Sequence, residues 1–224
     1  MPIFLKKGEV HLWQVFIEPF QSLEQLLLTM LAEDELAQAE RFLFVKDHFR
    51  YVAAHGILRV LLSRYLNIMP QKICFTKGCY HKPELCKGVT EEKFSFNISH
   101  SQDMVVLAFG NYSNIGVDVE YVRDIPDFSE IVDHFFHPEE KKQLQLLSYW
   151  QKQQLFFDFW TCKEAFVKAT GEGCHRSFDS FYITKLKDEC FAVSGKNIKN
   201  DDWYVIPYRC TPNYAVAVVC DHLA

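Results

Sequence analysis

The stretch that decides the fold is Gly116-Val117-Asp118-Val119-Glu120, followed further along the chain by Trp160-Thr161-Cys162-Lys163-Glu164-Ala165-Phe166-Val167-Lys168. The first segment predicts a β-strand, because apolar side chains alternate with carboxylates. Successive side chains of a strand point to opposite faces, so Asp118 and Glu120 are expected on the same face. The second segment predicts an α-helix, on which Glu164 and Lys168 are one turn apart.

Asp118, Glu120 and Glu164 are carboxylates that can converge if the helix packs against the strand. Oxygen ligands of this kind suit a hard divalent cation, and the lysines beside Glu164 suit a phosphorylated substrate. The alternative is an ordinary carboxylate pair on an edge strand, together with a simple i,i+4 ion pair between Glu164 and Lys168. Each segment alone is compatible with that alternative.

A third element, Phe96-Asn97-Ile98-Ser99-His100-Ser101, ends another predicted strand. With it, the chain resembles the 4'-phosphopantetheinyl transferases of the larger, surfactin-synthetase-associated (Sfp-like) type. Those enzymes carry N-I-S-H-S, then G-[VI]-D-[VI]-E, then W-[ST]-x-K-E-[AS]-x-x-K-x-x-G, in that order. Shorter matches lie at Arg41-Phe42, Arg50-Tyr51, Arg59, Ser63-Arg64-Tyr65, Lys82-Pro83-Glu84-Leu85 and Phe135-Phe136-His137-Pro138. The resemblance therefore runs from about residue 40 to residue 185.

The order of predicted elements is helices followed by strands, and it occurs twice. Strands are expected at 10–17, 73–76, 94–98, 104–110, 115–121, 181–185, 190–194, 203–209 and 214–220, with long helices at 47–66 and 151–170. A loop holding Gly78, Pro83 and Gly88 is expected between the second and third of these strands. Tight hairpins with segregated helices predict an α+β fold.

The resemblance implies two similar α+β halves related by a pseudo-two-fold axis, the 4'-phosphopantetheinyl transferase fold. We place the first half at residues 1–102, and the second, with the metal site, at 103–224. An internally duplicated chain needs no second subunit to build a cleft between its halves, so we expect a monomer.

Composition restricts the class of protein. The chain has 224 residues, 49% of them hydrophobic, which is enough to bury a sizeable core. The formal net charge of −5 argues against a nucleic-acid-binding protein, so an anionic substrate must be met by a local cluster of bases. The N-terminus lacks the pattern of a signal peptide and no apolar run is long enough to span a membrane, so we expect a cytoplasmic protein.

Eight cysteines occur, at positions 74, 79, 86, 162, 174, 190, 210 and 220. Without evidence of export, reduced thiols are expected. Cys74, Cys79, Cys86 and His81 form a possible zinc knuckle, but they lack the C-x2-C pair usual in zinc sites. Cys162 is interpreted as a small packed side chain.

The resemblance also implies the reaction: transfer of 4'-phosphopantetheine from coenzyme A to a serine of an apo carrier protein, with release of adenosine 3',5'-bisphosphate. It assigns Asp118, Glu120 and Glu164 as Mg²⁺ ligands. Glu164 or a metal-bound water would act as the general base, a choice that the sequence leaves open. Lys168 would contact the diphosphate as a point charge, and Lys163 is predicted to point away from Glu164.

For the nucleotide part of coenzyme A, the resemblance assigns a basic rim that consists of Arg41, Arg50, Lys82, Ser99, His100 and Lys168. Two departures from the family pattern affect this rim. The stretch upstream of Arg41 is acidic where relatives often carry lysines, and His81 replaces the glycine before Lys82-Pro83. Asn97 is expected to brace the turn.

Two alternatives remain. A divalent-metal phosphohydrolase acting on a nucleotide-like substrate would use the same carboxylates, and a non-catalytic coenzyme-A-binding module would use only the rim. For the carrier, we expect docking on an apolar surface between Arg123 and Leu155 with Lys141 and Lys142 as basic neighbours; Leu144 and Leu147 are expected to be buried.

Overall fold

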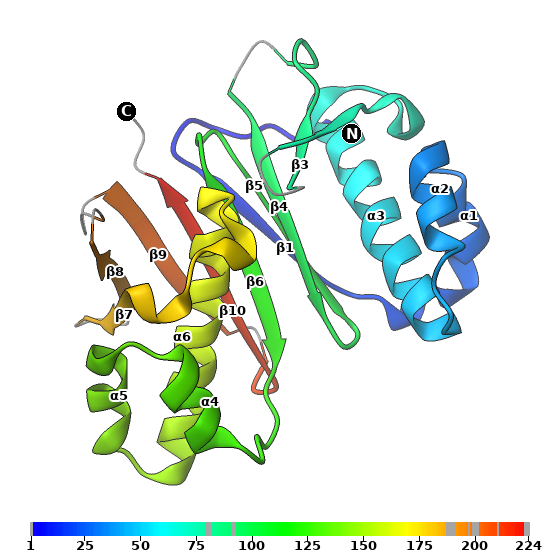
Figure 1. Cartoon of the computed structure of the whole chain (residues 1–224). Helices are drawn as coiled ribbons and strands as arrows, with labels where there is room; N and C mark the ends of the chain where they lie inside the picture. Colours follow the sequence, from blue (N-terminus) through cyan, green and yellow to red (C-terminus); the bar gives the residue numbers. More distant parts are fainter. Residues whose placement is uncertain are drawn as a thin grey trace.

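Two antiparallel sheets lie side by side in the middle of the molecule, with helices covering their outer faces (Figure 1). The computed structural model describes residues 2–78, 82–90, 93–186, 191–196, 198, 202–209 and 211–221. The α-helices are α1 (Glu24–Leu28), α2 (Glu33–Ala39), α3 (Val45–Leu66), α4 (Phe128–Phe135), α5 (Pro138–Gln145) and α6 (Tyr149–Thr170). Short 3-10 helices are η1 (Glu18–Leu23), η2 (Pro70–Lys72), η4 (Gly173–His175) and η5 (Phe178–Ser180).

The strands divide into three sheets. They are β1 (Val10–Phe16), β2 (Phe75–Lys77), β3 (Pro83–Leu85), β4 (Ser95–Ser101), β5 (Met104–Gly110), β6 (Ile115–Tyr121), β7 (Phe181–Lys185), β8 (Phe191–Gly195), β9 (Trp203–Tyr208) and β10 (Tyr214–Asp221). The sheet orders are β1-β5-β4, β6-β10-β9-β8-β7 and the hairpin β2-β3. Each large sheet is covered by one helix of 22 residues, α3 or α6, so the expected α+β fold with two similar halves is confirmed.

Two expectations about element positions need correction. The loop expected around Pro83 contains the short strand β3, which pairs with β2. Proline is tolerated there because it is the first residue of an edge strand, where no partner needs its N–H. The expected boundary after residue 102 assigns β5 to the second half, whereas β5 pairs with β1 and β4; by sheet membership the first half extends through Gly110.

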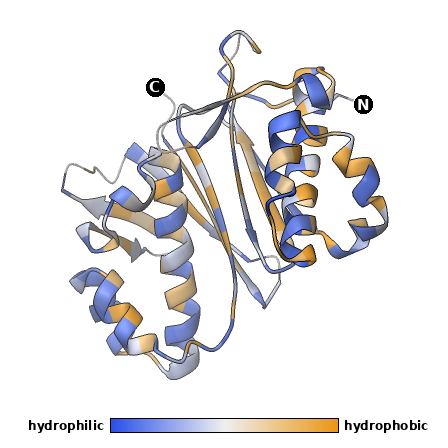
Figure 2. Cartoon of the chain, turned by 45° about the vertical axis from the view of Figure 1, so that its right-hand side comes forward, coloured by the Kyte–Doolittle hydropathy of each residue, from blue (hydrophilic) through white to orange (hydrophobic). Residues whose placement is uncertain are grey.

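The core explains the long apolar runs of β5 and β10. Every residue of β5 is buried, because Val105, Leu107 and Phe109 pack toward α3 while the alternate residues face the second sheet. Figure 2 shows these inner strands as largely apolar between helices that are polar on their outer faces. Strands that are buried on both faces carry continuous rather than alternating apolar residues. No helix in the described part of the chain is both long and apolar enough to cross a membrane.

The cysteine prediction is wrong at one pair. Cys74 and Cys86 form a disulfide with a Cα–Cα distance of 5.5 Å, within the range that disulfides span. The expectation of reduced thiols came from the cell compartment, which cannot show that β2 and β3 bring these residues together. The same pairing argues against the zinc knuckle, whose Cys79 and His81 lie outside the described residues. Cys162 and Cys220 are buried free thiols, and Cys162 is a packed side chain as expected.

Gly116 allows α6 to lie directly against β6. A Cβ atom at this position would overlap the carbonyl oxygen of Ala165 and the amide nitrogen of Ala169. Because these are backbone atoms, no rotamer change can relieve the overlap. Gly116 therefore sets the distance between the strand that carries Asp118 and the helix that carries Glu164.

We expect Gly116→Ala to lower the free energy of unfolding by about 3 kcal/mol or more, at the upper end of overpacking effects. Denaturant unfolding followed by circular dichroism measures this change. Gly88→Asn is a suitable control, because a side chain there would meet nothing within 4 Å and Asn tolerates its φ of +85°. Equal stability of the Gly116 and Gly88 variants would contradict the proposed close packing.

Candidate functional site

The site lies where β4 and β6, the facing edges of the two large sheets, run next to each other. The two strands are joined by side chains: Asn97 Oδ1 accepts a hydrogen bond from the backbone N of Val117 at 2.9 Å. Asn97 therefore bridges the halves, whereas we expected it to brace a turn. Ser101 Oγ donates to Glu120 Oε2 at 3.2 Å, on the same face of β4.

Asp118 is the centre of this seam. Its Oδ1 accepts hydrogen bonds from Ser99 Oγ at 2.9 Å and from Lys168 Nζ at 2.7 Å. Lys168 also donates to Ser99 at 2.8 Å, so a residue from each of β4, β6 and α6 meets here. The other oxygen of Asp118, Oδ2, is buried and has no hydrogen-bond partner. An unpartnered buried carboxylate oxygen is costly, which marks this atom as a position for a ligand.

The neighbouring carboxylates carry perturbed pKa values. Burial and the nearby Asp118 raise the pKa of Glu120 to about 7. The same two causes, burial first, raise the pKa of Glu164, while Lys168 acts in the opposite direction. Asp118 thus lies close enough to both Glu120 and Glu164 to raise the pKa of each, as expected if the helix packs on the strand.

The three carboxylates do not form a closed ligand set. Among the described residues, no group of three or more His, Cys, Asp or Glu side chains is arranged to hold a metal ion. Lys168 instead forms an ion pair with Asp118. The metal assignment of Asp118, Glu120 and Glu164 thus stays a prediction, although an oxygen-only donor set with one orphan oxygen fits a hard cation.

Most of the predicted basic rim surrounds this seam. His100 is exposed at the end of β4, and partial burial together with Lys168 and Arg50 lowers its pKa. Arg50 donates to Asp47 at 3.0 Å and to Gln102 at 3.2 Å, while its Nε is buried without a partner. Thus Arg50 and Lys168 both lie close enough to His100 to favour its neutral form.

Lys82 and Arg41 occupy different places. Lys82 Nζ crosses from the β2–β3 hairpin to the carbonyl oxygen of Ile115 at 2.8 Å, and burial lowers its pKa to about 8. Arg41 is exposed just after α2 and donates to Gln38 at 3.3 Å. Its side chain has no interaction with the cluster around His100 among the contacts of the described residues.

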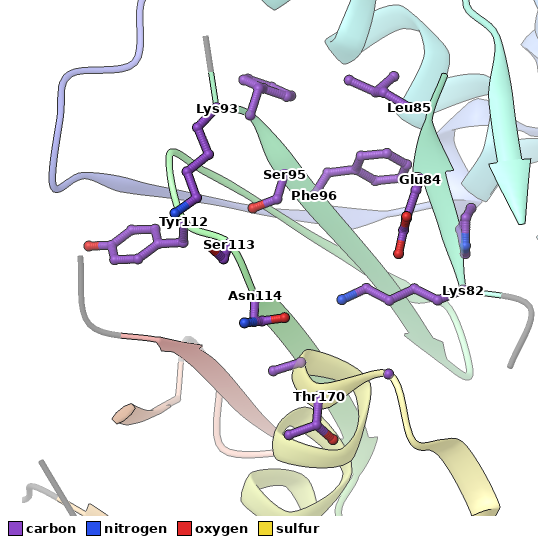
Figure 3. A pocket seen from close by; sticks show the side chains of 14 residues that line it. Lys82, Glu84, Leu85, Lys93, Ser95, Phe96, Tyr112, Ser113, Asn114 and Thr170 are labelled. Atoms are coloured by element: carbon purple, nitrogen blue, oxygen red, sulfur yellow. The ribbon is translucent and has the colours of Figure 1, made fainter. Parts of the chain in front are cut away.

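Two cavities meet at Lys82. One of about 230 Å³ lies on the Lys168 side and is lined by Lys82, Pro83, Asn97, Ile98, Val167, Lys168, Gly171 and Gly173. The other, about 540 Å³, lies behind the hairpin and includes Ser95, Asn114 and Thr170. In Figure 3, the Lys82 side chain extends toward Asn114 between the hairpin and the end of α6. Lys82, Pro83 and Gly171 therefore line both cavities.

A third cavity, of about 250 Å³, lies beside Glu120. Its lining is mostly apolar and comes from the segment after β6 and from α6; it includes Ile125, Ile131, Phe156 and Trp160. A carboxylate at one end of an apolar cavity can orient an amphipathic chain.

Lys163 is buried in a different part of the molecule. Its Nζ lies 2.9 Å from Glu140 Oε1 and donates to the carbonyl oxygens of Phe178 and Phe181 at 2.7 and 2.6 Å. It points away from Glu164, as expected. The ion pair with Glu140 holds α5 against α6 and was not foreseen, because the two residues are far apart in the sequence.

Two family models match most of the chain. The model of the 4'-phosphopantetheinyl transferase superfamily matches residues 114–219, and the model of the 4'-phosphopantetheinyl transferase N-terminal region matches residues 16–111. The division between these models falls between β5 and β6, in agreement with the sheet pairing.

Among curated relatives, the chain is 41% identical over 169 residues to the 4'-phosphopantetheinyl transferase HetI of Nostoc sp. (strain PCC 7120). This alignment covers 75% of this chain and 71% of HetI. It is 26% identical over 202 residues to the 4'-phosphopantetheinyl transferase Sfp of Bacillus subtilis (strain 168), covering 90% of this chain and 87% of Sfp. The solved structure of holo-[acyl-carrier-protein] synthase from Thermotoga maritima aligns with a TM-score of 0.41 at 19% identity, over 50% of this chain and 65% of that chain.

The raised pKa of Glu120 predicts how stability depends on pH in protein free of divalent cations. The folded state holds this proton more tightly than the unfolded state, so the contribution to stability is complete below the ordinary value of 4.5 and is lost as the pH rises through about 7. Glu120→Gln cannot ionise, so its melting temperature relative to the parent protein should increase as the pH rises from about 5 to about 8.

Thermal unfolding at both pH values in the presence of a chelator measures this effect. Glu139→Gln is the matched control, because a hydrogen bond from Lys142 lowers the pKa of Glu139. Glu139 is therefore ionised in both the folded and the unfolded state from about pH 5 to about pH 8, and the melting temperature of Glu139→Gln relative to the parent protein should stay constant. A constant difference between Glu120→Gln and the parent protein at all pH values would contradict the strained carboxylate cluster.

Proposed function

The chain belongs to the 4'-phosphopantetheinyl transferase superfamily, and it transfers 4'-phosphopantetheine to carrier proteins; we propose that the seam between β4 and β6 is where this transfer occurs. The observation that supports this best is the position of Asp118, which has one oxygen bound to Lys168 and one buried oxygen without a partner. Because both strands belong to one chain, we propose that a monomer contains the complete site.

We propose that Asp118, Glu120 and Glu164 hold Mg²⁺, with the remaining positions filled by water and substrate phosphate. When bound, this cation would neutralise charge on the diphosphate of coenzyme A. Lys168 now donates to Asp118, and a diphosphate oxygen is an equivalent acceptor within the same reach of its ammonium group. Lys168 would thus stabilise the charge that develops on the leaving phosphate.

Glu164 is the proposed proton acceptor for the serine hydroxyl of the carrier. Burial and Asp118 raise its pKa, which brings its basicity closer to that needed near neutral pH. Glu164 belongs to α6, which packs on β6 at Gly116, and Asp118 acts on its carboxylate; both observations support this role beside the seam.

For the substrate, we propose that coenzyme A binds along the predicted rim of His100, Arg50, Lys82, Ser99 and Lys168, with Arg41 further out. Part of the acidic stretch upstream of Arg41 is removed from the surface, because Glu35 is buried and pairs with Arg59 and His55 in the core. This pairing lowers the negative charge that coenzyme A would meet. The small cavity at Lys82 and Pro83 suits the nucleoside part.

For the carrier, the region between Arg123 and Leu155 divides into buried and exposed residues. Leu144 is buried and Leu147 is half-buried, whereas Leu146, Tyr149 and Trp150 are exposed. Lys141 pairs with Asp133 and Lys142 pairs with Glu139, so their charges are partly neutralised. We therefore propose an apolar docking patch of Leu146, Tyr149 and Trp150, with the apolar cavity beside Glu120 receiving the pantetheine arm.

The first test concerns the chemistry. Glu164→Gln keeps the shape of the side chain but removes its charge, so transfer should slow by at least roughly 10²-fold. Purified protein, coenzyme A, Mg²⁺ and a panel of apo carriers are incubated, and the mass increase of each carrier is followed. Glu139→Gln serves as the control, and near-normal transfer by Glu164→Gln at saturating Mg²⁺ would remove Glu164 from the mechanism. Consumption of coenzyme A without a carrier would instead indicate a phosphohydrolase.

The second test concerns Lys82. Its charged form loses a proton near pH 8, so the KM for coenzyme A should rise as the pH passes through about 8. The loss of one charge-assisted contact corresponds to at least about a tenfold change. Lys82→Arg stays charged and should show no such rise. If the arginine variant follows the same pH profile as the parent protein, a group other than Lys82 titrates.

The third test concerns docking. Leu146 and Leu43 are each 93% exposed and lie in opposite halves of the chain. Leu146→Asp should raise the KM for the carrier by about tenfold or more, with an unchanged KM for coenzyme A, because it places a charge in the apolar patch. Leu43→Asp should change neither constant. Equal effects of the two variants on the carrier KM would place the docking surface elsewhere.

A further inference from the structure

The β2–β3 hairpin, here called the strap, contacts the second half of the molecule through Lys82 Nζ, which donates to the carbonyl oxygen of Ile115. It forms a separate two-stranded sheet, in which the pairs among the described residues are Phe75↔Leu85, Thr76↔Glu84 and Lys77↔Pro83. Pro83 contributes no N–H to this ladder. Isolated two-stranded hairpins of this size are marginally stable, so other contacts must hold the strap in place.

The Cys74–Cys86 disulfide closes the base of the strap. Cys74 directly precedes β2 and Cys86 directly follows β3, and the backbone N of Cys86 donates to the carbonyl oxygen of Cys74 at 3.0 Å. Phe75 anchors β2 in the core, with its ring 5.5 Å from that of Phe96 and the Arg59 guanidinium 4.8 Å from its centroid. The disulfide therefore ties β3 to a strand that is already fixed.

Lys82 lies at the other end of β3. The carbonyl oxygen of Lys82 accepts from the backbone N of Gly78 at 2.8 Å, and its ammonium group crosses to Ile115 on β6. A shift of β3 along β2 by one residue would turn alternate side chains to the opposite face. The register that the disulfide holds is thus the register in which Lys82 reaches the carbonyl oxygen of Ile115 on β6.

Both sulfur atoms belong to residues that solvent can reach. Cys74 is exposed and Cys86 is half-buried. The free thiols of the described residues, Cys162 and Cys220, are by contrast buried. Thiol–disulfide exchange requires access for an attacking thiolate. Only the pair at the strap meets this requirement among the described cysteine side chains.

We propose that Cys74 and Cys86 form a redox-responsive clasp that controls the affinity for coenzyme A through Lys82. In the reducing direction, two molecules of a low-molecular-weight thiol supply two electrons and two protons. The first attacks the disulfide to form a mixed disulfide, the second releases it, and the products are two protein thiols and the disulfide of the small thiol. The disulfide form preorganises Lys82 and binds coenzyme A more tightly; the dithiol form binds it more weakly. This role rests on the proposed use of Lys82 in coenzyme A binding.

The experiment uses the full chain equilibrated in reduced glutathione or in glutathione disulfide. Alkylation and peptide mass determination give the state of Cys74 and Cys86, and calorimetry without any carrier gives the Kd for coenzyme A. We expect reduction to raise this Kd by roughly three- to tenfold. Cys86→Ser should show the higher Kd in both buffers, and Lys82→Met should give one Kd for both redox states. Cys220→Ala, which keeps the clasp, should retain the redox response.

An unchanged Kd for coenzyme A after complete conversion between disulfide and dithiol would overturn the proposal. A Cys74–Cys86 pair that does not change state between the two buffers would overturn it as well. A redox response that persists in Lys82→Met would place the effect outside Lys82 and contradict the mechanism. Failure of this proposal can be distinguished from failure of the proposed function, because transfer to a carrier is measured separately. A protein that binds coenzyme A with a redox response but modifies no carrier would refute the function alone.

Discussion

The meeting of β4 and β6 is the constraint on which the rest of the structure depends. The two strands are edges of different sheets and contact each other through serine, asparagine and aspartate side chains, with Ser99, Asp118 and Lys168 at the centre. Because β4 and β6 belong to different sheets, polar side chains rather than a backbone ladder connect them at this junction. The same interface therefore joins the halves and holds the groups that we propose for the reaction.

The packing around this seam keeps negative and positive groups close together. Gly116 brings α6 against β6, so Glu164 and Lys168 lie over the strand that carries Asp118 and Glu120. Burial raises the pKa of the two glutamates and Lys168 compensates Asp118. Asp118 also raises the pKa of both glutamates, and a bound cation would relieve this repulsion between like charges.

Sequence patterns predicted the local features of the site well. Alternation along Gly116–Glu120 placed both carboxylates on one strand, and the spacing of Glu164 and Lys168 placed them one turn apart on a helix that the structure extends from Tyr149 to Thr170. Arg41 shows the limit of such reasoning. It matches the family pattern, yet it bonds to Gln38 at the surface, because a motif match does not define where a side chain points.

The sequence by itself determined the α+β class, the two long helices, the family and the residues of the seam, because these depend on short-range periodicity and on motifs of a few residues. Only the tertiary structure decided which distant residues meet. Four contacts join segments that are far apart in the sequence, so no local pattern predicts them. They are the Glu140–Lys163 and Glu35–Arg59 ion pairs, the Cys74–Cys86 disulfide and the hydrogen bond from Lys82 to Ile115. Burial, which makes an unpaired charge costly, selects these partners, and burial exists only once the chain has folded.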